Sequence, residues 1–282
     1  MAIYAAGFTI IKKVTPLHVG PMGFVALRVL GATPLLWLTG LLIPEKMERR
    51  DIGKLAVLSL FGVTINQSLF IKGMSLTSPI SGAIIMITSP LLVLIIGSIV
   101  LKERITALRL TGIIVGLGGA IMLVVTNGLA AAKADNPFGD LLIFVNALSW
   151  GTFLVLVKPL MQKYHTVNVL KWIFLFGMII LVPLGYHDVS KIDWSTITPE
   201  LWFDILFVVI GVTFIAYLLN VYGLKALSPA VVSAYIYLQP VMAAAIAIYV
   251  GADELSWFKV LSALLIFSGV MLTSLKPASK VE

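Results

Sequence analysis

A succession of long apolar runs, separated by short polar loops, limits the fold of this chain more than any other feature of its sequence. A helix needs about 20 apolar residues to cross the hydrocarbon core of a bilayer. The runs lie at 2–16, 22–43, 54–74, 79–101, 106–126, 139–160, 167–185, 201–223, 229–250 and 257–275. They predict an all-α integral membrane protein with ten transmembrane helices. The first run is short, and we expect the chain to begin inside its first helix, through N-terminal truncation or a late start codon.

Composition supports the same class and excludes several others. Only 12% of the 282 residues are charged and 60% are hydrophobic, whereas about a quarter of the residues of a soluble domain are charged. The net charge of +7 is spread over short loops, as in membrane proteins, so we expect no nucleic-acid partner. The chain has no cysteine, its three histidines are scattered over loops, and it lacks a phosphate-binding loop. We therefore expect no metal, no cofactor and no ATP-driven step.

Lysine and arginine are divided unequally between the two sets of alternate loops. One set holds thirteen of these residues and the other holds six, leaving out Arg28, which lies within a span. Because cytoplasmic loops carry the basic excess, the larger set predicts the cytoplasmic side. With ten spans, both termini are then expected in the cytoplasm, and the plasma (inner) membrane is the expected location.

The two halves of the chain resemble each other at an offset that stays between 149 and 151 residues. The matching positions are Gly62-Val63-Thr64 with Gly211-Val212-Thr213, Ser78-Pro79 with Ser228-Pro229, Pro90 with Pro240, Glu103 with Glu254, and Gly118 with Gly269. Five spans, an odd number, separate each pair, so the halves are expected to have opposite orientations. We predict a 5+5 inverted repeat, with repeats at 1–126 and 139–275, a linker loop at 127–138 and a cytoplasmic tail at 276–282. Secondary transporters commonly bind their solute between such halves.

Several local features resemble one known family. The sixth span carries Trp150-Gly151-Thr152-Phe153 followed by Lys158, the second span carries an arginine, and the Glu103 and Glu254 loops each precede a glycine-rich helix. Together with the paired prolines, these features resemble the EamA-type family of the drug/metabolite transporter superfamily over essentially the whole chain. The resemblance implies ten helices in an inverted repeat and the transport of amino acids, other small metabolites or drugs.

Two positions depart from the pattern of that family. Ala5-Ala6 replace the Trp-Gly pair in the first repeat, and the second repeat has no arginine at its matching position near Ile173. We still expect a secondary transporter, an exporter of small organic metabolites such as amino acids, working by alternating access between the repeats. A channel-like or structural membrane protein is the alternative. A membrane-embedded lipid enzyme is less favoured, because no cluster of His, Asp or Glu supplies catalytic residues.

Polar and aromatic side chains within the spans are the candidates for a solute cavity. A charge is costly inside a membrane, so Arg28 is expected to face a cavity or gate, with snorkelling toward headgroups as the alternative. The amides of Asn66 and Gln67 need partners, which either a cavity or a neighbouring helix supplies. The other candidates combine aromatic rings with amides, as pockets for small organic solutes do; they are Trp150, Tyr217, Asn220, Tyr235 and Gln239. Asn146 lies in the same span as Trp150.

Prolines and glycines within the spans predict bending and close packing. Pro90 and Pro240 lie mid-span at matching positions, which favours paired hinges for alternating access over static kinks. Pro79 and Pro229 each follow a serine and are expected to begin helices in a structural role. The GxxxG pattern of Gly112 favours packing within a monomer, with a homodimer face as the alternative. The remaining expected partners are a small-molecule solute and the lipid bilayer.

Overall fold

Helices make up all the regular secondary structure in the computed structural model, which describes residues 1–15, 18–77, 79–128, 136–249 and 256–275. The first half contains α1 (Ala2–Val14), α2 (Pro21–Leu41), α3 (Arg49–Ser59), the π-helix η1 (Leu60–Ile65), α4 (Asn66–Leu76), α5 (Pro79–Ile87), α6 (Ser89–Val100) and α7 (Ala107–Gly128). The second half contains α8 (Pro137–Lys163), α9 (Thr166–Val189), the 3₁₀ helix η3 (Trp194–Thr196), α10 (Pro199–Leu206), the π-helix η4 (Phe207–Ala216), α11 (Tyr217–Tyr222), the 3₁₀ helix η5 (Gly223–Lys225), α12 (Pro229–Ala234), the 3₁₀ helix η6 (Tyr235–Tyr237), α13 (Leu238–Tyr249) and α14 (Trp257–Ser274). Ser78, most of the predicted linker loop, Glu254 and the predicted tail lie outside the described residues.

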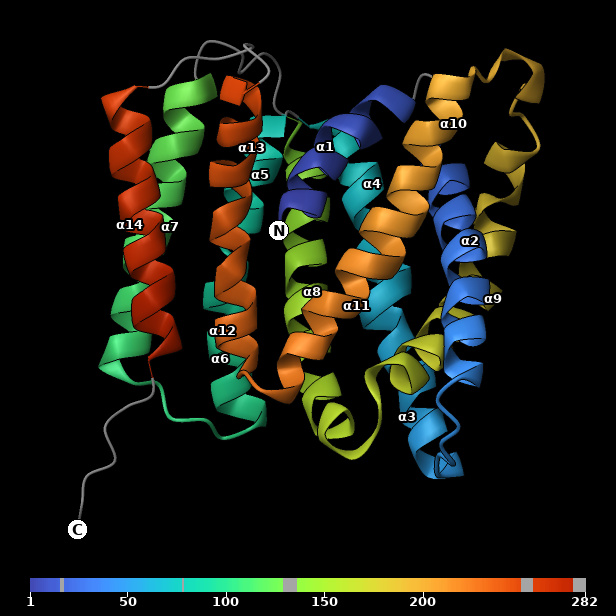
Figure 1. Cartoon of the computed structure of the whole chain (residues 1–282), viewed down its shortest axis with the longest axis horizontal. Helices are drawn as coiled ribbons and strands as arrows, with labels where there is room; N and C mark the ends of the chain where they lie inside the picture. The colour runs from blue at the N-terminus through green and yellow to red at the C-terminus, as the bar shows by residue number, and fades with distance from the viewer. Residues whose placement is uncertain (16–17, 78, 129–135, 250–255, 276–282) are drawn as a thin grey trace.

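Nine helical segments within the described residues are long and apolar enough to cross a membrane. They confirm the all-α integral membrane class. The remaining expected span is α1, whose 13 residues are fewer than a full crossing needs. Figure 1 places the N-terminus at mid-height of the bundle, away from the end at which α14 finishes. Which side of the membrane each terminus faces stays a prediction.

Matching helices of the two halves run in opposite directions. In Figure 1, α7 rises through the bundle whereas α14 descends. A methyl group added to Gly31 of α2 would lie 2.5 Å from a Val209 side-chain carbon in η4. A methyl group added to Gly177 of α9 would lie 2.5 Å from a Val63 side-chain carbon in η1. The second span of each half thus packs against the π-helix of the other half, a reciprocity that fits the predicted inverted repeat.

Each half contains a π-helical segment where the apolar pattern predicts an uninterrupted α-helix. The repeated Gly-Val-Thr motif falls inside both segments, with Gly62-Val63-Thr64 in η1 and Gly211-Val212-Thr213 in η4. A π-helix bonds residue i to i+5, and its junctions with α-helix leave carbonyl groups without a partner in the helix. The sequence repeat therefore marks two equivalent irregularities that span periodicity did not reveal.

The two mid-span prolines lie next to helix breaks. The fourth span divides between α5 and α6 at Thr88, immediately before Ser89 and Pro90, and the Leu91 amide donates to the Thr88 carbonyl at 3.0 Å. In the second half, the 3₁₀ helix η6 separates α12 from α13, and Pro240 follows in the first turn of α13. The predicted interruption is present in both halves, while its movement stays a prediction.

Side-chain caps explain where several spans begin. Ser228 Oγ accepts a hydrogen bond from the Val231 amide at 3.4 Å, with Pro229 in the first turn of α12. Thr198 and Pro199 start α10 in the same way, with a bond of 3.3 Å from the Leu201 amide. A proline in the first turn sacrifices no helical hydrogen bond. The structural role predicted for Ser228-Pro229 is confirmed.

Glycines allow α7 and α14 to pack closely against each other. A methyl group on Gly269 would lie 2.4 Å from the Gly116 backbone nitrogen, and one on Gly112 would lie 2.6 Å from the Thr273 backbone nitrogen. Backbone atoms cannot rotate away as a flexible side chain can. The GxxxG pattern therefore packs within the chain, as the sequence favoured.

We predict that Gly269→Val destabilises the α7–α14 pair, because overpacking a tight contact costs about 1–3 kcal/mol. Gly118→Val is the matched control, since a methyl group there meets no atom within 4 Å. Thermal unfolding of the detergent-solubilised protein should show a lower midpoint for the first variant alone. Equal midpoints for the two variants would contradict this packing.

Candidate solute cavity

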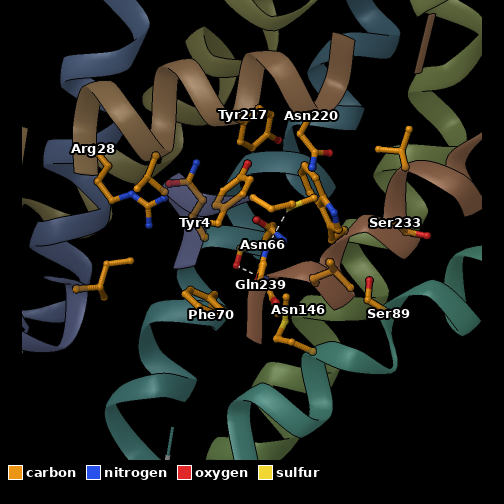
Figure 2. A pocket seen from close by; sticks show the side chains of 18 residues that line it. Tyr4, Arg28, Asn66, Phe70, Ser89, Asn146, Tyr217, Asn220, Ser233 and Gln239 are labelled. Carbon is orange, nitrogen blue, oxygen red and sulfur yellow. Dashed lines mark hydrogen bonds between the residues drawn. The ribbon is translucent and has the colours of Figure 1, made fainter. Parts of the chain in front are cut away.

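A cavity of about 120 Å³ lies between the two halves of the bundle. The structure brings seven of the eight residues singled out from the sequence to its walls: Arg28, Asn66, Gln67, Trp150, Tyr217, Asn220 and Gln239. Figure 2 shows these walls converging from helices of both halves. The cavity also includes residues outside that group, among them Tyr4, Phe70, Ser89, Asn146 and Ser233.

Tyr235 is the exception, because it does not line this cavity. It lines a neighbouring pocket together with Met1, Tyr4 and Asn220. Tyr235 begins the 3₁₀ helix η6, in which each residue turns the chain further than in an α-helix. Facing directions inferred from α-helical periodicity therefore fail at this residue, and its expected place in the shared cavity is corrected.

Arg28 is buried between the halves and does not snorkel toward a membrane surface. Its side chain is 7% exposed, and Nε donates to Thr213 Oγ1 of η4 at 2.9 Å. The Thr213 hydroxyl donates in turn to the Val208 carbonyl at 2.8 Å. No Asp or Glu is found among the described residues that line the cavity. The guanidinium is thus held by a neutral hydroxyl, which leaves its charge uncompensated by the cavity walls.

Amide side chains form a second part of the wall. Gln67 is 3% exposed, and neither atom of its amide has a protein partner among the described residues. Asn146 Nδ2 donates to the Asn66 backbone carbonyl at 2.6 Å, which joins α8 to α4. Asn220 Oδ1 also lacks a protein partner in the described part of the chain. Unpaired buried amides are costly, so the wall is suited to a polar solute or water.

Tyr217 and Trp150 form a third, aromatic part of the wall, and Phe174 packs against Tyr217 from outside the lining. The ring centroids of Trp150 and Phe174 lie 5.2 Å and 5.1 Å from that of Tyr217, both edge to face. Tyr217 Oη donates to the Gly62 carbonyl of η1 at 2.6 Å. This single side chain therefore connects the aromatic wall of the second half to the π-helix of the first.

The sequence contains only partial signals for the other lining residues. Asn146, noted beside Trp150 in the sixth span, lies one helical turn before it, whereas Ser89, which directly precedes the repeated Pro90, was not predicted. Tyr4 occupies a span too short to place by length alone. The predicted absence of a metal site stays a prediction, although the described residues contain no group of three or more potential metal ligands.

Comparison with known proteins decides the family. The chain matches the EamA-like transporter family twice, over residues 1–125 and 137–275. The chain belongs to this family. An uncharacterized transporter of Archaeoglobus fulgidus is 27% identical over 281 residues, which cover 98% of this chain and 95% of that protein. The uncharacterized transporter YyaM of Bacillus subtilis is 26% identical over 233 residues, covering 82% of this chain and 76% of YyaM.

Two more distant similarities extend the comparison. A WAT1-related protein of Arabidopsis thaliana is 22% identical over 300 residues, covering 95% of this chain and 81% of that protein. One solved crystal structure superposes with a TM-score of 0.79 at 17% identity and covers 97% of this chain and 93% of its own. That structure shows a shared fold alone. The family and its named relatives make this EamA protein a multi-pass membrane transporter.

We predict that Tyr217→Phe destabilises the protein, because the buried Gly62 carbonyl loses its donor at a cost of about 1–3 kcal/mol. Tyr222→Phe on the same helix is the control, since Tyr222 is 54% exposed. Thermal unfolding of both variants in detergent measures the difference. If the two midpoints fall together, the Tyr217 hydroxyl does not hold η1 in place.

Proposed function

We propose that this EamA transporter is a secondary carrier that exports small organic metabolites bearing a carboxylate, amino acids among them. The observation that carries the proposal is the buried Arg28, which faces a cavity without an acidic partner among its described lining residues. An uncompensated cation in an apolar environment favours an anionic ligand, and guanidinium matches carboxylate geometry in a bidentate pair.

The remaining walls suit the organic part of such a solute. Trp150, Phe70 and Tyr4 offer aromatic surface, while Gln67 and Asn220 offer hydrogen-bonding groups. Pockets for small organic molecules combine a mostly apolar lining with a few polar groups that fix orientation. The cavity therefore favours a compact metabolite with one apolar side over an inorganic ion.

Alternating access is supported by paired irregularities on both sides of the cavity. The breaks near Pro90 and Pro240 lie in equivalent spans, as do the π-helices η1 and η4. Interrupted helices bend at lower cost than continuous ones, and inverted repeats place equivalent hinges toward opposite membrane faces. Bending them in turn opens the cavity to one side at a time, which a carrier needs and a channel does not.

We predict that Arg28→Gln lowers carboxylate transport at least tenfold, since a hydrogen bond to a charged group contributes about 1.5–3 kcal/mol. Uptake of radiolabelled amino acids and carboxylic acids into proteoliposomes measures the loss. Arg50→Gln, an exposed arginine, is the control and should transport normally. Unchanged rates for Arg28→Gln would remove the proposed recognition. Flux that does not saturate with solute would favour a channel.

We predict that Pro90→Ala and Pro240→Ala bias the carrier toward opposite facing states, because each restores one helix at an interruption. The measurement is the rate at which thiol reagents added on each side of the membrane label single cysteines placed along the cavity walls. The chain has no native cysteine that would also be labelled. Pro34→Ala and Pro183→Ala are matched controls, since those prolines lie inside the continuous helices α2 and α9. Unchanged accessibility in the first two variants would make their prolines merely structural.

A further inference from the structure

Asn146 is buried in the cavity wall with half of its amide unpaired. It is 1% exposed, and its Nδ2 donates to the Asn66 backbone carbonyl at 2.6 Å. A carbonyl can only accept, so this bond fixes which end of the amide is nitrogen. Oδ1 is therefore an acceptor, and it has no protein partner among the described residues. Because Asn146 lines the cavity, a donor group on a bound solute can reach this side chain and satisfy the oxygen.

Trp150 lies one helical turn beyond Asn146, and both side chains line the cavity. Residues spaced i and i+4 lie on one face of a helix. The indole ring carries negative charge density on its faces and attracts cations. An amide oxygen and an indole on the same helix face together form the surroundings that bind an ammonium group, which donates hydrogen bonds and carries positive charge.

Other oxygen atoms of the cavity lining also lack a protein partner. Ser89 Oγ is fully buried without a protein partner among the described residues, and the same is true of Asn220 Oδ1. In Figure 2, Asn146, Ser89 and Asn220 lie on the side of the cavity away from Arg28. The cavity thus has its cation at Arg28 and neutral oxygen atoms without protein partners elsewhere on its wall.

We propose that Asn146 and Trp150 form a subsite for the ammonium group of the solute, whose carboxylate is bound at Arg28. The solute is then a zwitterionic amino acid, and a carboxylic acid without the amine is a poor substrate. This inference rests on the proposed function, because it uses Arg28 as the carboxylate site. It adds a residue that discriminates between solutes that share the same carboxylate and side chain.

The test compares matched solutes in proteoliposomes of the full chain. One set is leucine, 4-methylpentanoate and isopentylamine, and a second is phenylalanine, 3-phenylpropanoate and phenethylamine. In whichever set is transported, the transport rate of the amino acid should exceed that of the corresponding acid by about tenfold or more. The reason is that the acid lacks the hydrogen bond from the charged ammonium group to Asn146. Asn146→Ala should lower this ratio about tenfold. Trp150→Leu should lower the ratio as well, which provides a second variant should Asn146→Ala not fold.

Ser149→Ala is the matched control. Ser149 Oγ donates to the Phe61 carbonyl at 2.8 Å, so this variant removes a bond from α8 to the third span, just as Asn146→Ala does. Ser149 does not line the cavity. Its variant should keep the wild-type ratio of amino acid to acid transport. An equal fall of the ratio in Ser149→Ala would assign the effect to packing and overturn the subsite.

Failure of the ammonium subsite and failure of the proposed transport function give different results. If the acid moves as fast as the amino acid and Asn146→Ala leaves their ratio unchanged, the ammonium subsite is overturned while carboxylate transport stands. If neither the amino acid nor the acid of any set is transported, the proposed function fails and the subsite fails with it.

Discussion

Backbone hydrogen bonding in an apolar solvent is the constraint on which the rest of this structure depends. A carbonyl freed by a π-helix cannot bond to lipid and must find a donor inside the protein. In η1 and at its junction with α4, the donors come from the second half: Ser149 to Phe61 at 2.8 Å, Tyr217 to Gly62 at 2.6 Å and Asn146 to Asn66 at 2.6 Å. These bonds join the halves and hold polar side chains around the cavity.

The two halves differ in charge around the cavity despite their common pattern. In η4, Thr213 bonds to the Val208 carbonyl and accepts from Arg28. Thr64, its counterpart in η1, has no protein partner for its hydroxyl among the described residues, and the second half has no arginine to approach it. The cavity is therefore asymmetric, with its cation supplied by one half alone. Such asymmetry allows a solute with distinct ends to bind in one orientation.

Side-chain donors and acceptors also complete helix ends away from the cavity. Lys158 Nζ donates to the carbonyls of Leu224 and Leu227, which terminate the eighth span beyond its last regular turn. At the other end of the bundle, Asp188 Oδ2 accepts from the Met22 and Gly23 amides at 3.0 and 3.2 Å, at the start of α2. Each pair involves spans that are distant in sequence. The Asp188 bonds join the two halves, whereas both Lys158 bonds lie within the second half.

The sequence by itself determined the membrane class, the approximate spans, the duplicated pattern and most of the polar residues around the cavity. It could do so because apolar length reports the thickness of the bilayer, and because buried charges and amides are too costly to lie against lipid. Only the tertiary structure decided that the Gly-Val-Thr motifs form π-helices, that Tyr235 lies outside the shared cavity, and that the Asn146 amide donates to Asn66 and leaves its oxygen without a protein partner among the described residues. The physical reason is that the π-helix carbonyls and the Asn146 amide depend on partners far along the chain, 80 residues apart for Asn146 and 155 for Tyr217, while Tyr235 depends on the 3₁₀ geometry of η6. No local pattern of hydrophobicity contains that information.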